Sequence, residues 1–282
     1  MGLTLERIWD ALIAARAHDW HAEPVWRRRL SGGELSLDQS GRWQVAEGLF
    51  DERAHTLLDT LAPLLPPRRL AIAQLGQSLD GRIATHSGHS HYINGPVARA
   101  HLHRLRALVD AVVIGAGTAL ADRPRLSVRQ VAGPDPVRVI IDPRGRVPAS
   151  GPLFEPGDAV APVLHLIATG VEPEPAPAHV ERLRLDLAGG GFAPAAILDA
   201  LAERGLGRVL VEGGADTVSR FVDAGALDRL HLLIAPLIIG SGRSGLELPV
   251  IDRLDQARRP PFRHFPLGDE LLIDVELRSV SR

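Results

Sequence analysis

Apolar residues follow two different rhythms along the chain, and the change falls close to residue 66. Before it, apolar positions recur at helical spacing over 5–15 and again over 57–65, which predicts amphipathic helices. Serine and glycines within 30–41 lie between them and favour turns over a long element. We therefore predict a mainly helical N-terminal extension over residues 1–68, in which the 57–65 stripe caps a neighbouring sheet.

Short apolar segments alternate with helical patterns in the remaining part, residues 69–282. Such alternation is typical of an α/β domain with a largely parallel sheet. Pro236 interrupts one strand pattern and predicts an edge-like strand, a candidate for a subunit interface. The predicted strands are 70–75, 111–114, 137–141, 164–168, 183–187, 208–211, 230–239 and 271–277, and the predicted helices are 95–109, 193–204 and 215–224.

Composition excludes several classes of chemistry. The chain has no cysteine, and all 32 of its basic residues are arginine. Disulfides, thiolate nucleophiles, Schiff-base lysines and a Walker A lysine are therefore excluded. The net charge of −2 gives no indication of nucleic-acid binding, and no apolar run is long enough to span a membrane. The charged residues near the N-terminus argue against a signal peptide, and we expect a cytoplasmic protein.

Two glycine turns follow apolar strand patterns. Glu212-Gly213-Gly214-Ala215 leads from a strand into a helix pattern, and Gly115-Ala116-Gly117-Thr118 does so less clearly. Glycine lets the backbone approach a ligand, and a helix N-terminus offers free N–H groups to a phosphate. An ordinary tight turn explains the same spacing equally well.

Arginines gather at two places. Arg99, His103 and Arg106 share one stripe of the 95–109 helix, beside its core stripe of Ala98, Leu102, Leu105 and Val109. Three further arginines follow between Arg123 and Arg129. Either group can bind a phosphate or simply face solvent. The histidines at 86, 89 and 91 have no carboxylate partners nearby, so we predict no metal site.

Several segments carry a family resemblance when taken in order. They resemble the reductase domain of the bifunctional riboflavin-biosynthesis deaminase–reductase, over about residues 70–280. The segments are SLDGRIAT (78–85), SHYING (90–95), HRLRALVDAVVIGAGTALADRPRLSVR (103–129), VRVIIDPRGRVP (137–148), LVEGGADTVSRFVDAGALDRL (210–230) and IAPLIIG (234–240).

The resemblance implies a dihydrofolate-reductase-like fold, a homodimer, NADPH as cofactor and a phosphorylated pyrimidine as substrate. The implied substrate contacts are Ser90, Arg106, Leu126, Arg129 and Glu212, with both arginines around the ribose phosphate. The implied cofactor contacts are Gly76, Tyr92, Thr118, Asp122, Gly213, Gly214, Ala215, Asp216, Thr217 and Arg220.

Two departures from the family pattern bear on specificity. Gln74 stands where bacterial members usually have lysine and is similar to the asparagine of archaeal and fungal reductases that act on the diaminopyrimidine. Pro143 replaces a serine associated with the adenosine end of the cofactor, which leaves Arg144 as a candidate partner of a 2′-phosphate.

The expected activity is NADPH-dependent reduction of a ribosylamino-pyrimidine 5′-phosphate to its ribitylamino product. Glu212 is the candidate catalytic residue, which orients the reacting nitrogen or relays a proton. A dihydropterin or dihydrofolate reductase is one alternative, because fold alone does not decide substrate. A nucleotide-binding protein without catalysis is another.

Overall fold

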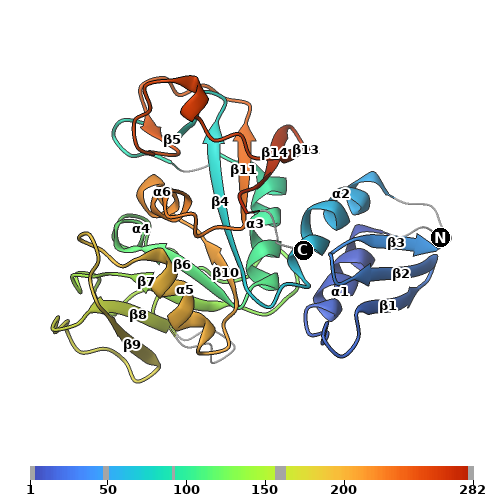
Figure 1. The fold of residues 1–282 in the computed structure, drawn as a ribbon, viewed down its shortest axis with the longest axis horizontal. Helices are drawn as coiled ribbons and strands as arrows, with labels where there is room; N and C mark the ends of the chain where they lie inside the picture. Colours follow the sequence, from blue (N-terminus) through green and yellow to red (C-terminus); the bar gives the residue numbers. More distant parts are fainter. Residues whose placement is uncertain (1–3, 47–50, 91–92, 156–162, 279–282) are drawn as a thin grey trace. The chain divides into compact units, whose positions relative to one another are not determined.

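The computed structural model describes residues 4–46, 51–90, 93–155 and 163–278. The chain divides into two compact units, Met1–Arg68 and Arg69–Arg282. Figure 1 labels their helices and strands. None of the helices in the described residues is both long and apolar enough to cross a membrane.

The first unit is a small α/β unit, so the expectation of a mainly helical extension is wrong. Strands β1 (Val25–Leu30), β2 (Gly33–Asp38) and β3 (Trp43–Ala46) form an antiparallel sheet and, in the sequence, lie between helices α1 (Leu5–Ala15) and α2 (Glu52–Leu61). The glycines at 32, 33 and 41 have positive φ angles and make the hairpin turns.

Burial in this unit follows strand and helix periods. Leu35 and Leu37 of β2 are both buried and are two residues apart, as on one face of a strand. Helix α2 continues into the 3₁₀ helix η1 (Ala62–Leu64) and packs on α1. The apolar stripe of 57–65 therefore has a packing partner inside its own unit.

The second unit is built on a mostly parallel sheet, as the sequence predicted. Nine strands of its described residues form this sheet in the order β13-β14-β11-β4-β10-β6-β7-β8-β9, and only the β13–β14 and β14–β11 pairs are antiparallel. The strands are β4 (Leu70–Ser78), β6 (Ala111–Gly115), β7 (Val137–Ile141), β8 (Val163–Ala168), β9 (Val180–Leu185), β10 (Arg208–Val211), β11 (Arg229–Ala235), β13 (Phe262–Leu267) and β14 (Glu270–Glu276).

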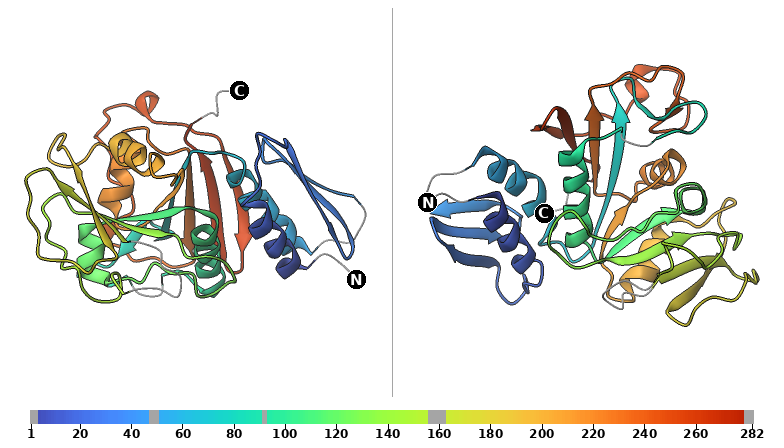
Figure 2. Two further views of the ribbon diagram at one scale, coloured as in Figure 1. Left: turned by 90° about the horizontal axis from the view of Figure 1, so that it is seen from below. Right: turned by 180° about the vertical axis from the view of Figure 1, so that it is seen from behind.

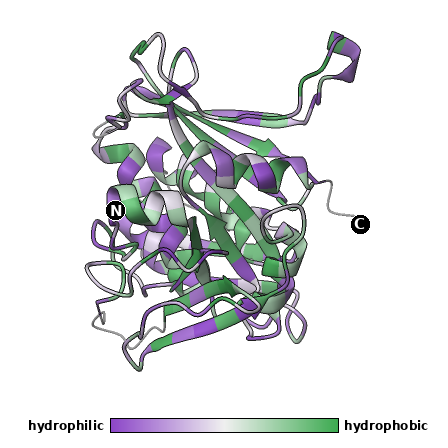
Figure 3. Ribbon diagram, turned by 90° about the vertical axis from the view of Figure 1, so that its left-hand side faces the viewer, coloured by the Kyte–Doolittle hydropathy of each residue, from purple (hydrophilic) through white to green (hydrophobic). Residues whose placement is uncertain are grey.

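Helices cover both faces of this sheet, as Figures 1 and 2 show. Helix α3 (Pro96–Leu108) lies on one face, and α5 (Pro194–Ala202) and α6 (Ala215–Asp223) lie on the other. The core between sheet, α5 and α6 contains Ala73, Val113, Val211, Ile197 and Phe221. The strands through the middle of Figure 3 are accordingly mostly hydrophobic.

Pro236 does not mark an edge strand. Strand β11 ends at Ala235, before the proline, and it pairs with β4 on one side and β14 on the other. The edges of the sheet are β13 and β9. The prediction of an edge at 230–239 is therefore wrong, because Pro236 begins the loop that follows the strand.

Five further elements were not expected from the pattern. Strand β5 (Arg82–Ala84) pairs with β12 (Arg243–Ser244), and β13 precedes β14 in a hairpin. Helix α4 (Ala116–Asp122) follows β6 directly, where the sequence indicated a glycine turn. A 3₁₀ helix, η2, spans Leu254–Gln256.

Candidate active site

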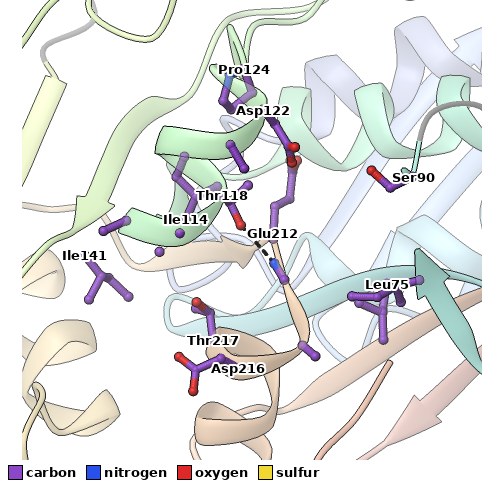
Figure 4. A pocket seen from close by; sticks show the side chains of 18 of the residues that line it. Leu75, Ser90, Ile114, Thr118, Asp122, Pro124, Ile141, Glu212, Asp216 and Thr217 are labelled. Carbon is purple, nitrogen blue, oxygen red and sulfur yellow. Dashed lines mark hydrogen bonds between the residues drawn. The ribbon is translucent and has the colours of Figure 1, made fainter. Parts of the chain in front are cut away.

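A cavity of about 1040 Å³ lies where β4, β6, β7 and β10 end. These strands are parallel, so their carboxyl ends meet at one edge of the sheet, where ligands of open α/β sheets bind. Figure 4 shows Ile141 and Ser90 on opposite sides of the site, with Thr118 and Glu212 between them.

The turn after β10 leads directly into helix α6. Gly213 has a φ of +126°, and Gly214 is the N-cap residue of the helix. The backbone N–H of Gly214 donates to Oγ1 of Thr118 on α4 over 3.0 Å (Figure 4). Both helices therefore begin at the cavity with their N-termini close together, and both glycine turns of the sequence line it.

Little room is left between these two turns. A Cβ on Gly115 would lie 2.4 Å from Oγ1 of Thr217, and one on Gly213 would lie 3.0 Å from Oγ1 of Thr118. Neither position accepts a side chain without movement. The glycines thus keep backbone amides accessible at a helix N-terminus, which is the arrangement that binds phosphates.

Arg106 and Glu212 form a buried bidentate ion pair at the cavity. Nε donates to Oε1 and Nη2 donates to Oε2, each over 2.7 Å, while Nη1 donates to the carbonyl of Ser127 over 3.1 Å. The side chains are only 7% and 10% exposed. Burial acts to lower the pKa of Arg106, but the Glu212 carboxylate outweighs it and raises that pKa above its ordinary value.

Positive charge surrounds His103, one turn from Arg106 on α3. Burial, together with Arg106, Arg129 and Arg99, lowers the pKa of His103 to about 4, so the ring is neutral near pH 7. Its Nδ1 accepts the backbone N–H of Arg129 over 2.9 Å. Burial and the neighbouring charges of Arg106 and Arg125 also lower the pKa of Arg129. A cluster of this kind favours an anion.

Gly76 of β4 and Asn94 lie very close to each other in the cavity wall. A Cβ on Gly76 would lie 1.8 Å from Oδ1 of Asn94. Nδ2 of Asn94 donates to Oε1 of Glu270 over 2.9 Å, and so does the backbone N–H of Gly95 over 3.1 Å. Glu270 therefore fixes the start of α3 beside β4.

Asp80 fixes the loop that follows β11. Its carboxylate accepts the hydroxyl of Ser78 and the backbone N–H groups of Ile239 and Gly240. These bonds lower the pKa of Asp80 to about 2. The loop leads to Gly242, Arg243 and Ser244, which line the cavity.

Most residues implied by the resemblance lie together at this cavity. Leu126 is buried and has a φ of +57°, a strained conformation for a bulky residue and one that clusters at functional sites. The lining residues from the predicted set are Gly76, Ser90, Arg106, Thr118, Asp122, Leu126, Glu212, Gly213, Gly214, Ala215, Asp216, Thr217 and Arg220.

One predicted residue, Arg129, is not brought into the cavity, and the prediction for Tyr92 is not tested by the described residues. Arg129 is not among its lining residues, and its Nη1 donates to the hydroxyl of Ser127 over 2.7 Å at the surface. Tyr92 lies outside the described residues, as does His91. In the part of the chain that the structure describes, no group of three or more histidine or acidic side chains could hold a metal ion.

Sequence reasoning missed several residues of the cavity wall. Leu102 was expected in the core stripe of α3 but lines the cavity. Asn94, Arg146 and Phe192 also line it and were not among the predicted site residues. The spacing of Leu102 gave no signal, because it fits the core stripe as well as the cavity wall. The two arginines that flank Gly145 were the one available signal for Arg146.

Comparisons with known proteins identify the family of the second unit. The family model of the RibD C-terminal domain matches residues 69–257. The riboflavin biosynthesis protein RibD of Aquifex aeolicus is 32% identical over 86% of this chain and 68% of its own length. The 2,5-diamino-6-ribosylamino-4(3H)-pyrimidinone 5′-phosphate reductase of Methanothermobacter thermautotrophicus is 31% identical over 75% of this chain and all of its own.

A solved structure has the same fold. It is the diaminohydroxyphosphoribosylaminopyrimidine deaminase/5-amino-6-(5-phosphoribosylamino)uracil reductase of Thermotoga maritima, with a TM-score of 0.61 and 28% identity. The match covers 80% of this chain and 61% of that one. The resemblance seen in the sequence is thus confirmed: the chain belongs to the family of RibD C-terminal domains.

Proposed function

We propose that this protein is an NADPH-dependent reductase that converts a ribosylamino-pyrimidine 5′-phosphate to its ribitylamino product in riboflavin biosynthesis. One observation carries the proposal. The Arg106–Glu212 pair and the Gly213–Gly214 turn of α6 line the same cavity, in a chain of the RibD C-terminal domain family. A polar pair that can orient a substrate and a phosphate-binding helix N-terminus are thus available in one cavity.

The residues around α6 fit a dinucleotide. Gly115 and Gly213 let the two turns pack closely, because a Cβ on either would meet a threonine hydroxyl, and the first turn of the nine-residue helix α6 faces the cavity. Gly213, Ala215, Asp216 and Thr217 would hold the diphosphate through backbone N–H groups, while the N–H of Gly214 donates to Thr118 and fixes the turn. When bound, NADPH supplies the hydride that the reaction requires.

The arginines of α3 and of the loop after α4 would hold the sugar phosphate. Arg99, Arg106 and Arg129 crowd around neutral His103, and a phosphate dianion relieves their mutual repulsion. Arg129 lies outside the cavity wall in this conformation. Its part therefore requires its side chain to turn away from Ser127 when substrate binds.

Glu212 would position groups rather than deliver a proton. Both of its oxygens accept hydrogen bonds from Arg106, so the carboxyl group is held in one orientation at the cavity. In that orientation its oxygens can also accept a hydrogen bond from a substrate N–H or hydroxyl. Of the two roles expected from the sequence, orientation of the reacting nitrogen is the better supported.

Gln74 of β4 would contact the pyrimidine ring. Its side chain is buried, lines the cavity, and has no hydrogen bond to the described residues. An amide both donates and accepts, whereas a lysine ammonium only donates. Gln74 can therefore accept a hydrogen bond from a ring amino group, as a diaminopyrimidine presents.

The test is NADPH oxidation, followed at the absorbance of reduced nicotinamide, with the deaminated and the non-deaminated pyrimidine supplied separately. We expect turnover of at least one, and faster turnover of the non-deaminated ring because of Gln74. NADPH binding without oxidation of either pyrimidine would contradict the proposal and support the non-catalytic alternative. The homodimer stays a prediction, which light scattering on the purified protein tests.

A further inference from the structure

A buried aspartate–histidine pair lies next to the cavity wall but outside it. Asp142 follows β7 directly, and His165 lies on the neighbouring strand β8. Both residues are fully buried. Nε2 of His165 is 3.2 Å from Oδ2 of Asp142, and the same oxygen accepts the backbone N–H of Val147 over 2.7 Å.

These two bonds close the turn of residues 142–147. The backbone N–H of Gly145 donates to the carbonyl of Asp142 over 3.0 Å, and the N–H of Asp142 donates to Leu166 over 2.9 Å. One carboxylate oxygen thus joins the far end of the turn, at Val147, to the neighbouring strand. Because His165 lies on strand β8, its hydrogen bond to Asp142 anchors the turn to the sheet.

The charge state of Asp142 suits this role. Burial alone would raise its pKa, but the hydrogen bonds from His165 and Val147, with a smaller contribution from the charge of Arg146, outweigh burial and hold the pKa below its ordinary value. The aspartate is therefore ionised, and its hydrogen bonds are charge-assisted, which makes them stronger than neutral ones.

The turn carries two arginines to the cavity. Arg144 and Arg146 flank Gly145, and both line the cavity together with Pro143. Gly145 has a φ of +62°, and a Cβ on it would lie 2.9 Å from Val171 and 3.0 Å from Pro173. Val171 and Pro173 therefore pack closely against Gly145 and restrict the turn. Neither guanidinium makes a hydrogen bond or ion pair with the described residues, so both are available to an anion.

We propose that the Asp142–His165 pair is a positioning device that sets Arg144 and Arg146 for the 2′-phosphate of NADPH, and so determines the preference for NADPH over NADH. The inference rests on the proposed function. It adds two residues that touch no ligand themselves. They act by fixing the backbone from which the two arginines extend.

The experiment measures the Kd of the full chain for NADPH and for NADH by isothermal titration calorimetry, together with KM and kcat for each cofactor, and the Kd should change in parallel with KM. His165→Leu keeps the volume and removes the donor to Asp142. We expect about a tenfold rise in KM for NADPH, a change of less than about twofold for NADH, and kcat within about twofold of wild type. His165→Gln keeps an N–H donor and should restore KM for NADPH to within about threefold.

A double-mutant cycle separates positioning from general destabilisation. In an Arg144→Ala/Arg146→Ala background, His165→Leu should raise KM for NADPH by less than about twofold further, because the arginines that it positions are gone. An equal rise in both backgrounds, or an equal rise for NADPH and NADH, would overturn the proposal. Asp142→Asn keeps the acceptor but not the charge. If His165→Leu fails to fold, Asp142→Asn replaces it in the same comparison, and we expect KM for NADPH to rise about threefold.

Failure of the proposed function is recognised separately. It shows as absence of NADPH binding and oxidation by the wild-type protein, before any variant is compared. A wild-type enzyme that uses NADPH and NADH equally well would leave the reductase assignment intact and overturn the positioning role alone.

Discussion

Arg106 of α3 and Glu212 after β10 neutralise each other inside the candidate active site, through two hydrogen bonds of 2.7 Å. Removing one charge of such a buried pair leaves the other uncompensated. We expect Glu212→Gln to lower the free energy of unfolding by about 3 kcal/mol. It should also lower kcat/KM at least about tenfold, because Arg106 loses its orientation.

Urea unfolding and steady-state kinetics check this expectation. Glu203→Gln, at an exposed position after α5, removes the same charge and should change stability by less than about 0.5 kcal/mol. Equal losses in the two variants would mean that the ion pair contributes nothing specific.

The phosphate role of the arginine cluster predicts a substrate-dependent effect. Arg129→Ala should raise KM for the phosphorylated pyrimidine about tenfold, since a charge-assisted contact is lost. Turnover of a dihydropterin, which has no sugar phosphate, should change far less. Steady-state kinetics with both compounds is the measurement.

Arg204→Ala is the matched control, because its guanidinium pairs with Glu181 at the surface. It should leave both activities unchanged. If Arg129→Ala affected the two compounds equally, the phosphate assignment of this arginine would be wrong, and the pterin alternative would gain support.

The close packing of the two glycine turns predicts a rescue. Gly115→Ala places a Cβ 2.4 Å from Oγ1 of Thr217, so either the Thr217 side chain or the first turn of α6 must move. We expect a loss of about 1–3 kcal/mol in stability and weaker NADPH binding. Thr217→Ala in the same chain removes the clashing hydroxyl and should recover most of the stability.

Gly117→Ala is the matched control, a glycine-to-alanine substitution at a position where the added Cβ meets no neighbouring atom. No atom lies within 4 Å of its added Cβ, and Gly117 is in the helix α4. Its thermal midpoint should rise, corresponding to about 0.5–1 kcal/mol, because alanine favours the helix. A fall in both variants would show that steric overlap with Thr217 is not the cause.

The state of His103 predicts a pH dependence of stability. Its pKa is about 4 in the folded protein and 6.5 in the unfolded chain, so the unfolded chain binds more protons between these values. The contribution of His103 is fully present above pH 6.5 and is lost as the pH falls towards 4. The slope approaches about 1.4 kcal/mol per pH unit within that window.

Denaturant unfolding from pH 4.5 to 7.5 measures this slope. His103→Gln should flatten it, whereas His264→Gln, at an exposed position of β13, should not. An unchanged slope in the His103 variant would mean that this ring is not the titrating group.

The sequence was sufficient where local pattern decides structure. Strands β7 and β10 have the predicted bounds, and α3 begins at Pro96, one residue after the predicted start. The pattern gave wrong predictions where a glycine is compatible with a loop, a hairpin turn and a helix N-cap. Glycines at 32, 33 and 41 make hairpin turns, and Gly115 is the N-cap of α4 rather than part of a longer turn.

The candidate site was predictable as a set of residues but not as a set of contacts. The resemblance gave Arg106 and Glu212 as neighbours of one substrate, but not as partners of each other. Their pairing depends on the packing of α3 against the strand end. His165 and Asp142 gave no signal at all, because a lone histidine in an apolar strand has no visible partner in sequence.

The contacts that define the site join distant parts of the chain. Arg106 and Glu212 are 106 residues apart, and Thr118 and Gly214 are 96 apart. Such contacts form only after β6 and β10 have come together, so a partly folded chain has no ligand pocket. A bound dinucleotide consequently acts on the global unfolding equilibrium, and it protects the entire Arg69–Arg282 unit from proteolysis rather than one loop.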